Sequence, residues 1–184
     1  MKATNELIQE HEGIEIMLRV LLALAGKFEN NEKIVFEHTD QILEFITTFV
    51  DKCHHGKEEE FLFPALQAAG FTRYDPPLGD VLREHEQGRI LTSRFKDGLK
   101  RHTAGDRTSA AGISRTITAY VSLLTRHIAR ENAVLFPLAD DKLEAVHDDE
   151  LVEAFARLER ERIGPGKHEE FHALLDRLRD AYLV

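Results

Sequence analysis

Apolar residues recur along most of the chain at every third or fourth position, the spacing that places them on one face of an α-helix. Turn residues interrupt this pattern at Asn30-Asn31, at Gly70 and Asp75-Pro76-Pro77, and at Gly105-Asp106. No stretch shows the alternation of apolar and polar residues expected of a half-buried strand. The pattern therefore predicts an all-α fold, an antiparallel up-down four-helix bundle with short connections. The predicted helices cover about 4–26, 34–61, 78–102 and 108–137.

The chain from about Asp140 onward predicts a helical hairpin that is broken at Ile163–Gly166. We expect residues 1–140 to form the bundle and residues 141–184 to form a C-terminal helical extension. The apolar stripes of this extension are expected to cover the bundle, with a homodimer contact as the alternative. These stripes are Leu151, Phe155 and Leu158 on one helix and Phe171, Leu174, Leu175 and Leu178 on the other.

The overall composition excludes several classes of partner. A net charge of −9 argues against nucleic acid and anionic membranes, because phosphate binding needs a basic patch. The longest apolar run, Val20–Ala25, is too short to span a bilayer, and the first residues lack the apolar core of a signal peptide. Cys53 is the only cysteine, so no internal disulfide can form and the cytoplasm is the expected compartment.

One polar pattern occurs twice in the chain. Glu10-His11-Glu12 recurs as Glu84-His85-Glu86. His54-x-x-x-Glu58, followed by Leu62-Phe63-Pro64, recurs at almost the same offset as His127-x-x-x-Glu131, followed by Leu135-Phe136-Pro137. Because proline lacks a backbone N–H, each Leu-Phe-Pro segment is expected to bend or end its helix and to wall off the site from water. The repeat predicts a pseudo-symmetric site to which each half of the chain contributes equally.

The repeated residues are of the types that bind metals. Residues four apart lie ~40° apart around a helix, so each His–Glu pair points in one direction. Imidazole binds iron, zinc and copper, and a carboxylate can bridge two ions. Four imidazoles and two carboxylates are more ligands than one tetrahedral zinc needs, and they fit two ions that share carboxylates. The predicted ligands are His11, His54, Glu58, His85, His127 and Glu131.

Each residue taken alone has a simpler interpretation. A single histidine on an amphipathic helix is usually a surface or core residue, and Glu58 lies in the charged run Lys57–Glu60. The repeat register selects Glu58, because it stands six residues before the proline, as Glu131 does. Cys53, next to His54, is interpreted as a small core residue rather than a thiolate ligand.

Over roughly residues 1–140 the chain resembles the hemerythrin-like, or HHE cation-binding, proteins. The resemblance is carried by HHGKEEEFLFP at His54–Pro64 and RHIARENAVLFP at Arg126–Pro137. It implies a four-helix bundle with a non-haem di-iron centre, bridged by oxo or carboxylate groups, whose ligands are the six residues named above. Glu58 and Glu131 are then the expected bridges.

The chain departs from the oxygen-carrying hemerythrins at two positions. Those proteins have a second histidine four positions after the third-helix ligand, where this chain has Arg89, and an aspartate five positions after the fourth-helix histidine, where it has Glu131 at four. Glu15, which corresponds to Arg89 in the first repeat, is a candidate extra ligand or a partner of Arg89. His55 is a candidate supplementary ligand, although a role outside the coordination sphere or at the surface is favoured.

Three functions follow as hypotheses. The first is a di-iron protein that binds or reacts with O2, peroxide or NO, by sensing, scavenging or catalase-like turnover rather than simple oxygen carriage; whether it is an enzyme stays open, as does the choice between monomer and homodimer. The second is an iron- or oxygen-responsive regulatory or structural module without catalysis. The third, a zinc hydrolase at His168-Glu169-Glu170-Phe171-His172, is disfavoured because this HExxH sequence lies outside the repeat and no third ligand follows it.

Overall fold

The computed structural model describes residues 1–183, with the backbone alone at Ala145, and every regular element within that range is helical. The all-α class predicted from the sequence is therefore confirmed. The helices of residues 1–183 are α1 (Lys2–Glu29), α2 (Phe36–Glu44), α3 (Phe63–Ala68), α4 (Leu78–Thr103), α5 (Ser109–Arg130), α6 (Phe136–Lys142), α7 (Ala145–Leu158) and α8 (Lys167–Tyr182). The π-helical segments of the same range are η1 (Phe45–His55), η2 (Glu58–Leu62), η3 (Glu131–Leu135) and η4 (Glu159–Ile163).

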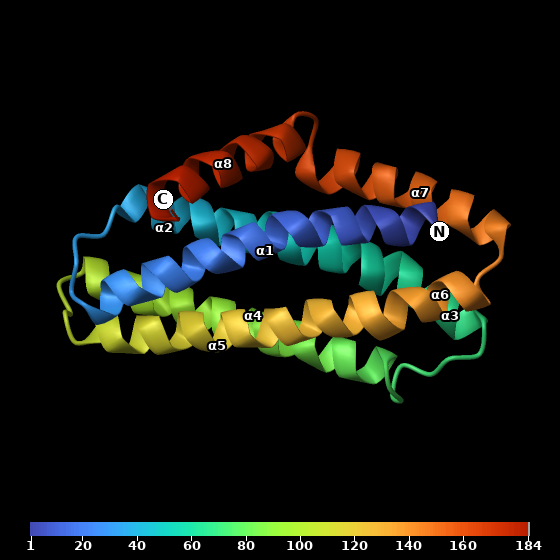
Figure 1. The fold of residues 1–184 in the computed structure, drawn as a ribbon, viewed down its shortest axis with the longest axis horizontal. Helices are drawn as coiled ribbons and strands as arrows, with labels where there is room; N and C mark the ends of the chain where they lie inside the picture. Colours follow the sequence, from blue (N-terminus) through green and yellow to red (C-terminus); the bar gives the residue numbers. More distant parts are fainter. Residues whose placement is uncertain (184) are drawn as a thin grey trace.

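The helices assemble into an elongated antiparallel bundle (Figure 1). Its first rod is α1, its second runs without a break from α2 through η1 and η2 to α3, its third is α4, and its fourth runs from α5 through η3 to α6. α5 packs against both α1 and α4, and η1 packs against α1 and α4, which closes the bundle. No helix within residues 1–183 is long and apolar enough to cross a membrane.

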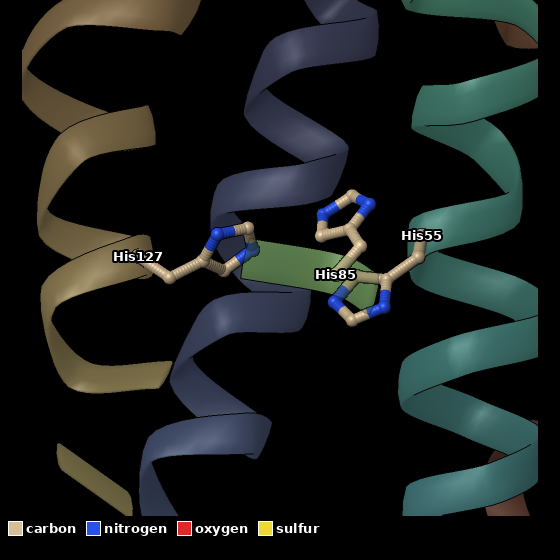
Figure 2. A group of neighbouring side chains, drawn as sticks. All are labelled: His55, His85 and His127. Carbon is tan, nitrogen blue, oxygen red and sulfur yellow. The ribbon is translucent and has the colours of Figure 1, made fainter. Parts of the chain in front are cut away.

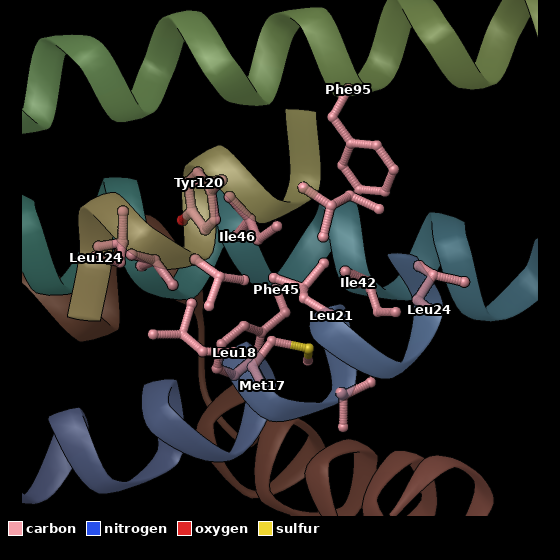
Figure 3. Close-up of a cluster of buried hydrophobic side chains, with 14 of the residues drawn as sticks. Met17, Leu18, Leu21, Leu24, Ile42, Phe45, Ile46, Phe95, Tyr120 and Leu124 are labelled. Atoms are coloured by element: carbon pink, nitrogen blue, oxygen red, sulfur yellow. The ribbon is translucent and has the colours of Figure 1, made fainter. Parts of the chain in front are cut away.

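Two apolar clusters divide the interior of the bundle. The central cluster includes Met17, Leu21, Phe45, Phe95 and Tyr120 (Figure 3). The end cluster lies near the N-terminus and the short helices α3 and α6, at the right of Figure 1. Along α1 the end cluster stops at Leu7 and the central cluster begins at Ile14, and along the fourth rod Ile128 belongs to one and Leu135 to the other. The intervening layer is where the repeated histidines and glutamates lie.

Neither proline of the Leu-Phe-Pro segments ends its helix. A π-helical segment begins at Glu58 and another at Glu131, and in each case the following α-helix starts one residue before the proline. At that position the missing N–H interrupts no hydrogen bond of the new α-helical segment. The helices therefore continue beyond Pro64 and Pro137, to Ala68 and Lys142, and change helical type at the two glutamates. π-helical turns of this kind occur frequently at functional sites.

The C-terminal hairpin lies along one side of the bundle, where α7 and α8 pack against α1. Leu151 and Phe155 join the end cluster, and the apolar stripe of α8 joins the central cluster. Gly164 and Gly166 form the turn at positive φ values of 92° and 81°, which side chains disfavour. Both stripes of the hairpin are thus buried against the bundle of the same chain.

We expect Phe155→Ala to lower the free energy of unfolding by about 3–5 kcal/mol, because Phe155 is fully buried and its loss leaves a cavity. Chemical denaturation measures this value. Val146→Ala, on the exposed side of the same helix, is the control and should change stability by less than about 0.5 kcal/mol. Equal effects of the two substitutions would show that α7 does not pack on the bundle.

Candidate metal centre

The six ligands predicted from the repeat converge in the layer between the two apolar clusters. Each is exposed by 1% or less. Their nitrogen and oxygen atoms form two overlapping groups, within each of which one such atom per residue lies within 4.8 Å of the others. Both groups contain the two glutamates. One group is His11, His54, Glu58 and Glu131, and the other is Glu58, His85, His127 and Glu131.

The distances show how closely the two glutamates are surrounded by imidazoles. Glu131 Oε2 lies 3.1 Å from His11 Nε2 and 3.3 Å from His127 Nε2, so it reaches both groups. Glu58 lies 3.3 Å from His85 Nε2 and 3.9 Å from His54 Nε2 through its two oxygens. Each carboxylate therefore stands between one imidazole of the first group and one of the second, which is the position that a bridging ligand requires.

The other ring nitrogen, Nδ1, of each histidine is held from outside the layer. His54 Nδ1 lies 2.7 Å from Glu10 and His127 Nδ1 lies 3.1 Å from Glu84. His11 and His85, the two histidines that are not part of a His-x-x-x-Glu pair, follow the same rule. Nδ1 of His85 lies 2.6 Å from Glu59, and Nδ1 of His11 lies 2.9 Å from Asn132. An acceptor at Nδ1 fixes the proton there and leaves the Nε2 lone pair free to bind a metal.

These outer partners were missed in the sequence, although the repeat register contains the signal for them. Glu10 and Glu84 are corresponding residues of the two Glu-His-Glu triplets, and Glu59 and Asn132 directly follow the two ligand glutamates. The contacts cross between helices, since Glu10 holds His54 rather than its neighbour His11. Spacing along one helix could not predict a contact of that kind.

The phenylalanines of the two Leu-Phe-Pro segments stack on the rings of His11 and His85. Phe136 stacks on His11 with ring centroids 5.5 Å apart, and Phe63 stacks on His85 at 6.0 Å. Both phenylalanines are buried in the end cluster. The predicted shielding of the site from water is therefore present in the structure.

The unpaired polar atoms of this layer test whether a cation fits. Within the described residues 1–183, both carboxylate oxygens of Glu58 and of Glu131, and Nε2 of His85 and His127, are buried without a hydrogen-bond partner. His11 Nε2 and His54 Nε2 lie 3.0 Å apart, and with both Nδ1 protons directed outward their lone pairs face each other. Leaving one buried polar group unpaired costs about 1–3 kcal/mol, so a layer with six such atoms fits a cation among them. The donor set of imidazoles and carboxylates suits iron, among other transition metals.

Burial also sets the charge of the predicted ligands. It lowers the pKa of His54 and His85 well below the usual imidazole value, and neighbouring imidazoles lower it further, so both rings are neutral and able to bind a metal at pH 7. Burial and the Glu131 carboxylate raise the pKa of Glu58 well above its usual value. Burial likewise opposes ionisation of Glu131, but the charges of His127 and His11 outweigh it and bring its pKa to about 2. A bound cation would remove the conflict between the two carboxylates by displacing the proton from Glu58.

A third group of ligand-type residues, Glu10, Cys53 and Glu159, already surrounds a cation of the protein itself. The Lys57 ammonium is fully buried and lies 2.5 Å from Glu10, 2.7 Å from Glu6 and 2.6 Å from Glu159. Burial would lower the pKa of Lys57, but Glu10 and Glu6 outweigh it and raise the pKa. Burial raises the pKa of the Cys53 thiol to about 12, so the thiol stays protonated and is a poor ligand.

Of the further residues considered as metal ligands in the sequence, some lie beside the predicted centre and others lie away from it. Glu15 is exposed in a surface groove, and the Arg89 guanidinium contacts Asp51 and Glu59, at 2.7 Å each, rather than Glu15. His55 is buried beside His85 and His127 (Figure 2). His168 and His172 line a groove between α8 and the bundle, and within residues 1–183 neither belongs to a group of three or more potential ligands.

Comparison with known proteins identifies the family. The model of the Hemerythrin HHE cation binding domain matches residues 2–139, which include all six predicted ligands. The chain belongs to this family of cation-binding proteins. It is also similar to uncharacterized proteins of Mycobacterium tuberculosis and Mycobacterium bovis, at 26% identity over 179 residues, which cover 97% of this chain and 68% of theirs. No solved structure matches the chain.

We expect Glu84→Gln to weaken metal binding by about 10–100-fold, because Glu84 fixes the proton and the orientation of His127. Competition with a chelator measures the change in affinity. Glu86→Gln is the matched control, since Glu86 belongs to the same triplet but is exposed, and it should bind metal as the unmodified protein does. If the two variants bound metal equally well, the outer contact would have no part in ligation.

Proposed function

We propose that this protein holds two iron ions and that the iron pair binds or reacts with O2, peroxide or NO. The observation that supports this most directly is the pair of overlapping ligand groups that share two buried, unpaired carboxylates. One ion would be held by His11 and His54 and the other by His85 and His127, with Glu58 and Glu131 common to both. Shared carboxylates favour a metal pair over a single structural zinc.

The protein contributes position and dryness to this chemistry. An iron pair, when bound, supplies two adjacent redox-active Lewis acids for a small oxidant. The imidazoles are oriented by Glu10, Glu59, Glu84 and Asn132, so their Nε2 atoms point at the centre before any metal arrives. The apolar clusters on both sides exclude water and strengthen electrostatic interactions within the layer.

The surroundings of Arg89 favour sensing, scavenging or catalase-like turnover over reversible oxygen carriage. Arg89 stands where oxygen-carrying hemerythrins place a further histidine, and its guanidinium is directed to Asp51 and Glu59 at the surface. It contributes no nitrogen to the centre. The ligand set of this chain therefore differs from that of the carriers.

A second candidate, a regulatory or structural metal module, is favoured by one specific contact. Glu10 accepts from His54 through one oxygen and from Lys57 through the other, and Lys57 also binds Glu159 of the C-terminal extension. The state of the centre is thereby linked to the extension. This candidate requires that iron loading change the exposure of the extension to a protease while the iron stays unreactive.

Elemental analysis tests the first half of the proposal. Protein expressed with ample iron and purified without chelators should contain about two irons per chain, as expected for shared carboxylate bridges. His168→Ala should leave this content unchanged, because His168 lies outside both ligand groups. One zinc per chain, or no metal, would contradict a di-iron centre.

Mixing experiments test the second half. Ferrous protein prepared without oxygen is exposed separately to O2, to hydrogen peroxide and to NO, and its visible spectrum is followed in time. A response to at least one of the three is expected. A loaded protein that responds to none would leave the metal site intact but eliminate the proposed reactivity in favour of the structural module.

A further inference from the structure

We propose that His55 is a third imidazole ligand of the His85–His127 half of the centre. The inference rests on the proposed di-iron function and extends it to a residue outside the repeated ligand set. His55, His85 and His127 form a group of buried imidazoles whose ligand atoms lie within 4.8 Å of one another. Figure 2 shows the three rings reaching toward one another from η1, α4 and α5.

The unpaired atoms of His55 support ligation. Both of its ring nitrogens are buried and have no hydrogen-bond partner in the part of the chain that the structure describes. Nδ1 nevertheless faces a carboxylate, since it lies 3.6 Å from Asp51 Oδ1, and Asp51 is itself held by Arg89 Nε at 2.7 Å. His55 thus has a carboxylate on the Nδ1 side of its ring, as His54, His85 and His127 do, and its Nε2 is the nitrogen left for a metal.

The backbone explains how adjacent histidines can serve different halves of the centre. In an α-helix consecutive side chains diverge by ~100°, which would direct a residue next to a ligand away from the site. His54 and His55 end the π-helical segment η1, whose wider turn brings consecutive side chains closer in direction. Their ring centroids are 5.7 Å apart; His54 adjoins His11, whereas His55 adjoins His85.

His55 also breaks the symmetry of the repeat. The corresponding residue of the second repeat, next to His127, is Ile128, which is buried in the central cluster. The His85–His127 half therefore has an additional imidazole for which the His11–His54 half has no equivalent. The two metal positions should differ in ligand number and hence in affinity and spectroscopic signature.

Stacking is the alternative role for His55, and it can be separated from ligation. The His55 ring lies nearly parallel to that of His85, at 17° and 3.8 Å between centroids. His55→Phe keeps a flat ring of similar size in this place but removes both nitrogens. His102→Phe is the matched control, because His102 is also a buried histidine but contacts Ser109 and Phe28 outside both ligand groups.

Iron retention during chelator challenge is the first readout, and the Mössbauer spectrum of the iron-loaded protein is the second. We expect His55→Phe to lower the binding affinity for one of the two irons by at least about 10-fold, since that iron loses a ligand. The Mössbauer signal of that iron alone should change. His102→Phe should behave as the unmodified protein. His55→Ala should show the same loss, and added imidazole should restore it, because a cavity of about 260 Å³ adjoins His55.

The outcomes separate this inference from the proposed function. If the unmodified protein and His55→Phe both hold two irons with equal affinity and identical spectra, His55 is a stacking ring and the inference is wrong. If His55→Ala loses iron and imidazole does not restore it, ligation by His55 is likewise overturned. An unmodified protein without an iron pair would instead overturn the proposed function, on which this inference depends.

Discussion

Glu58 and Glu131 bring two carboxylates into one buried layer of the bundle, where neither accepts a hydrogen bond from residues 1–183. Moving a carboxylate out of water costs several kcal/mol even after relaxation, and two of them in one place repel each other. The His54 and His85 imidazoles, with their protons fixed at Nδ1, present lone pairs rather than donors. A cation among them would satisfy all of these groups together, so the interior of this protein is organised as a site for positive charge.

The rest of the fold serves that layer through contacts that cross between helices and occur twice. The residue after each ligand glutamate holds a single histidine of another helix, Glu59 on His85 and Asn132 on His11. The phenylalanine four positions further on stacks on the same ring. A π-helical turn begins at each of the two glutamates, so the residues that follow have the same arrangement in both halves of the chain. The predicted ligand, the partner that orients the imidazole and the ring that shields it thus repeat as one unit.

The sequence was sufficient to predict the helices and to select six residues that the structure brings together, because both depend on spacing within one helix and on a repeat that can be recognised by eye. It was insufficient wherever the outcome depends on contacts between helices. Glu10 and Glu84 resemble solvated charges until the neighbouring helix is in place. The position of His55 was judged from α-helical geometry, and the segment that carries it is π-helical. His55 is buried among imidazoles, so a surface position is wrong, whereas the choice between a ligand and a residue outside the coordination sphere stays a prediction. The continuation of the helices past Pro64 and Pro137 has the same origin.

Lys57 links the C-terminal extension to the candidate metal centre, a contact that the sequence of the extension does not predict. The family match ends at residue 139, yet one of the three carboxylates around this ammonium belongs to Glu159. A residue outside the matched domain therefore contributes to the electrostatic surroundings of His54. A change of charge at position 159 would therefore reach His54 through Lys57 and Glu10, so members of this cation-binding family that differ only in their C-terminal segments need not bind a cation with equal affinity.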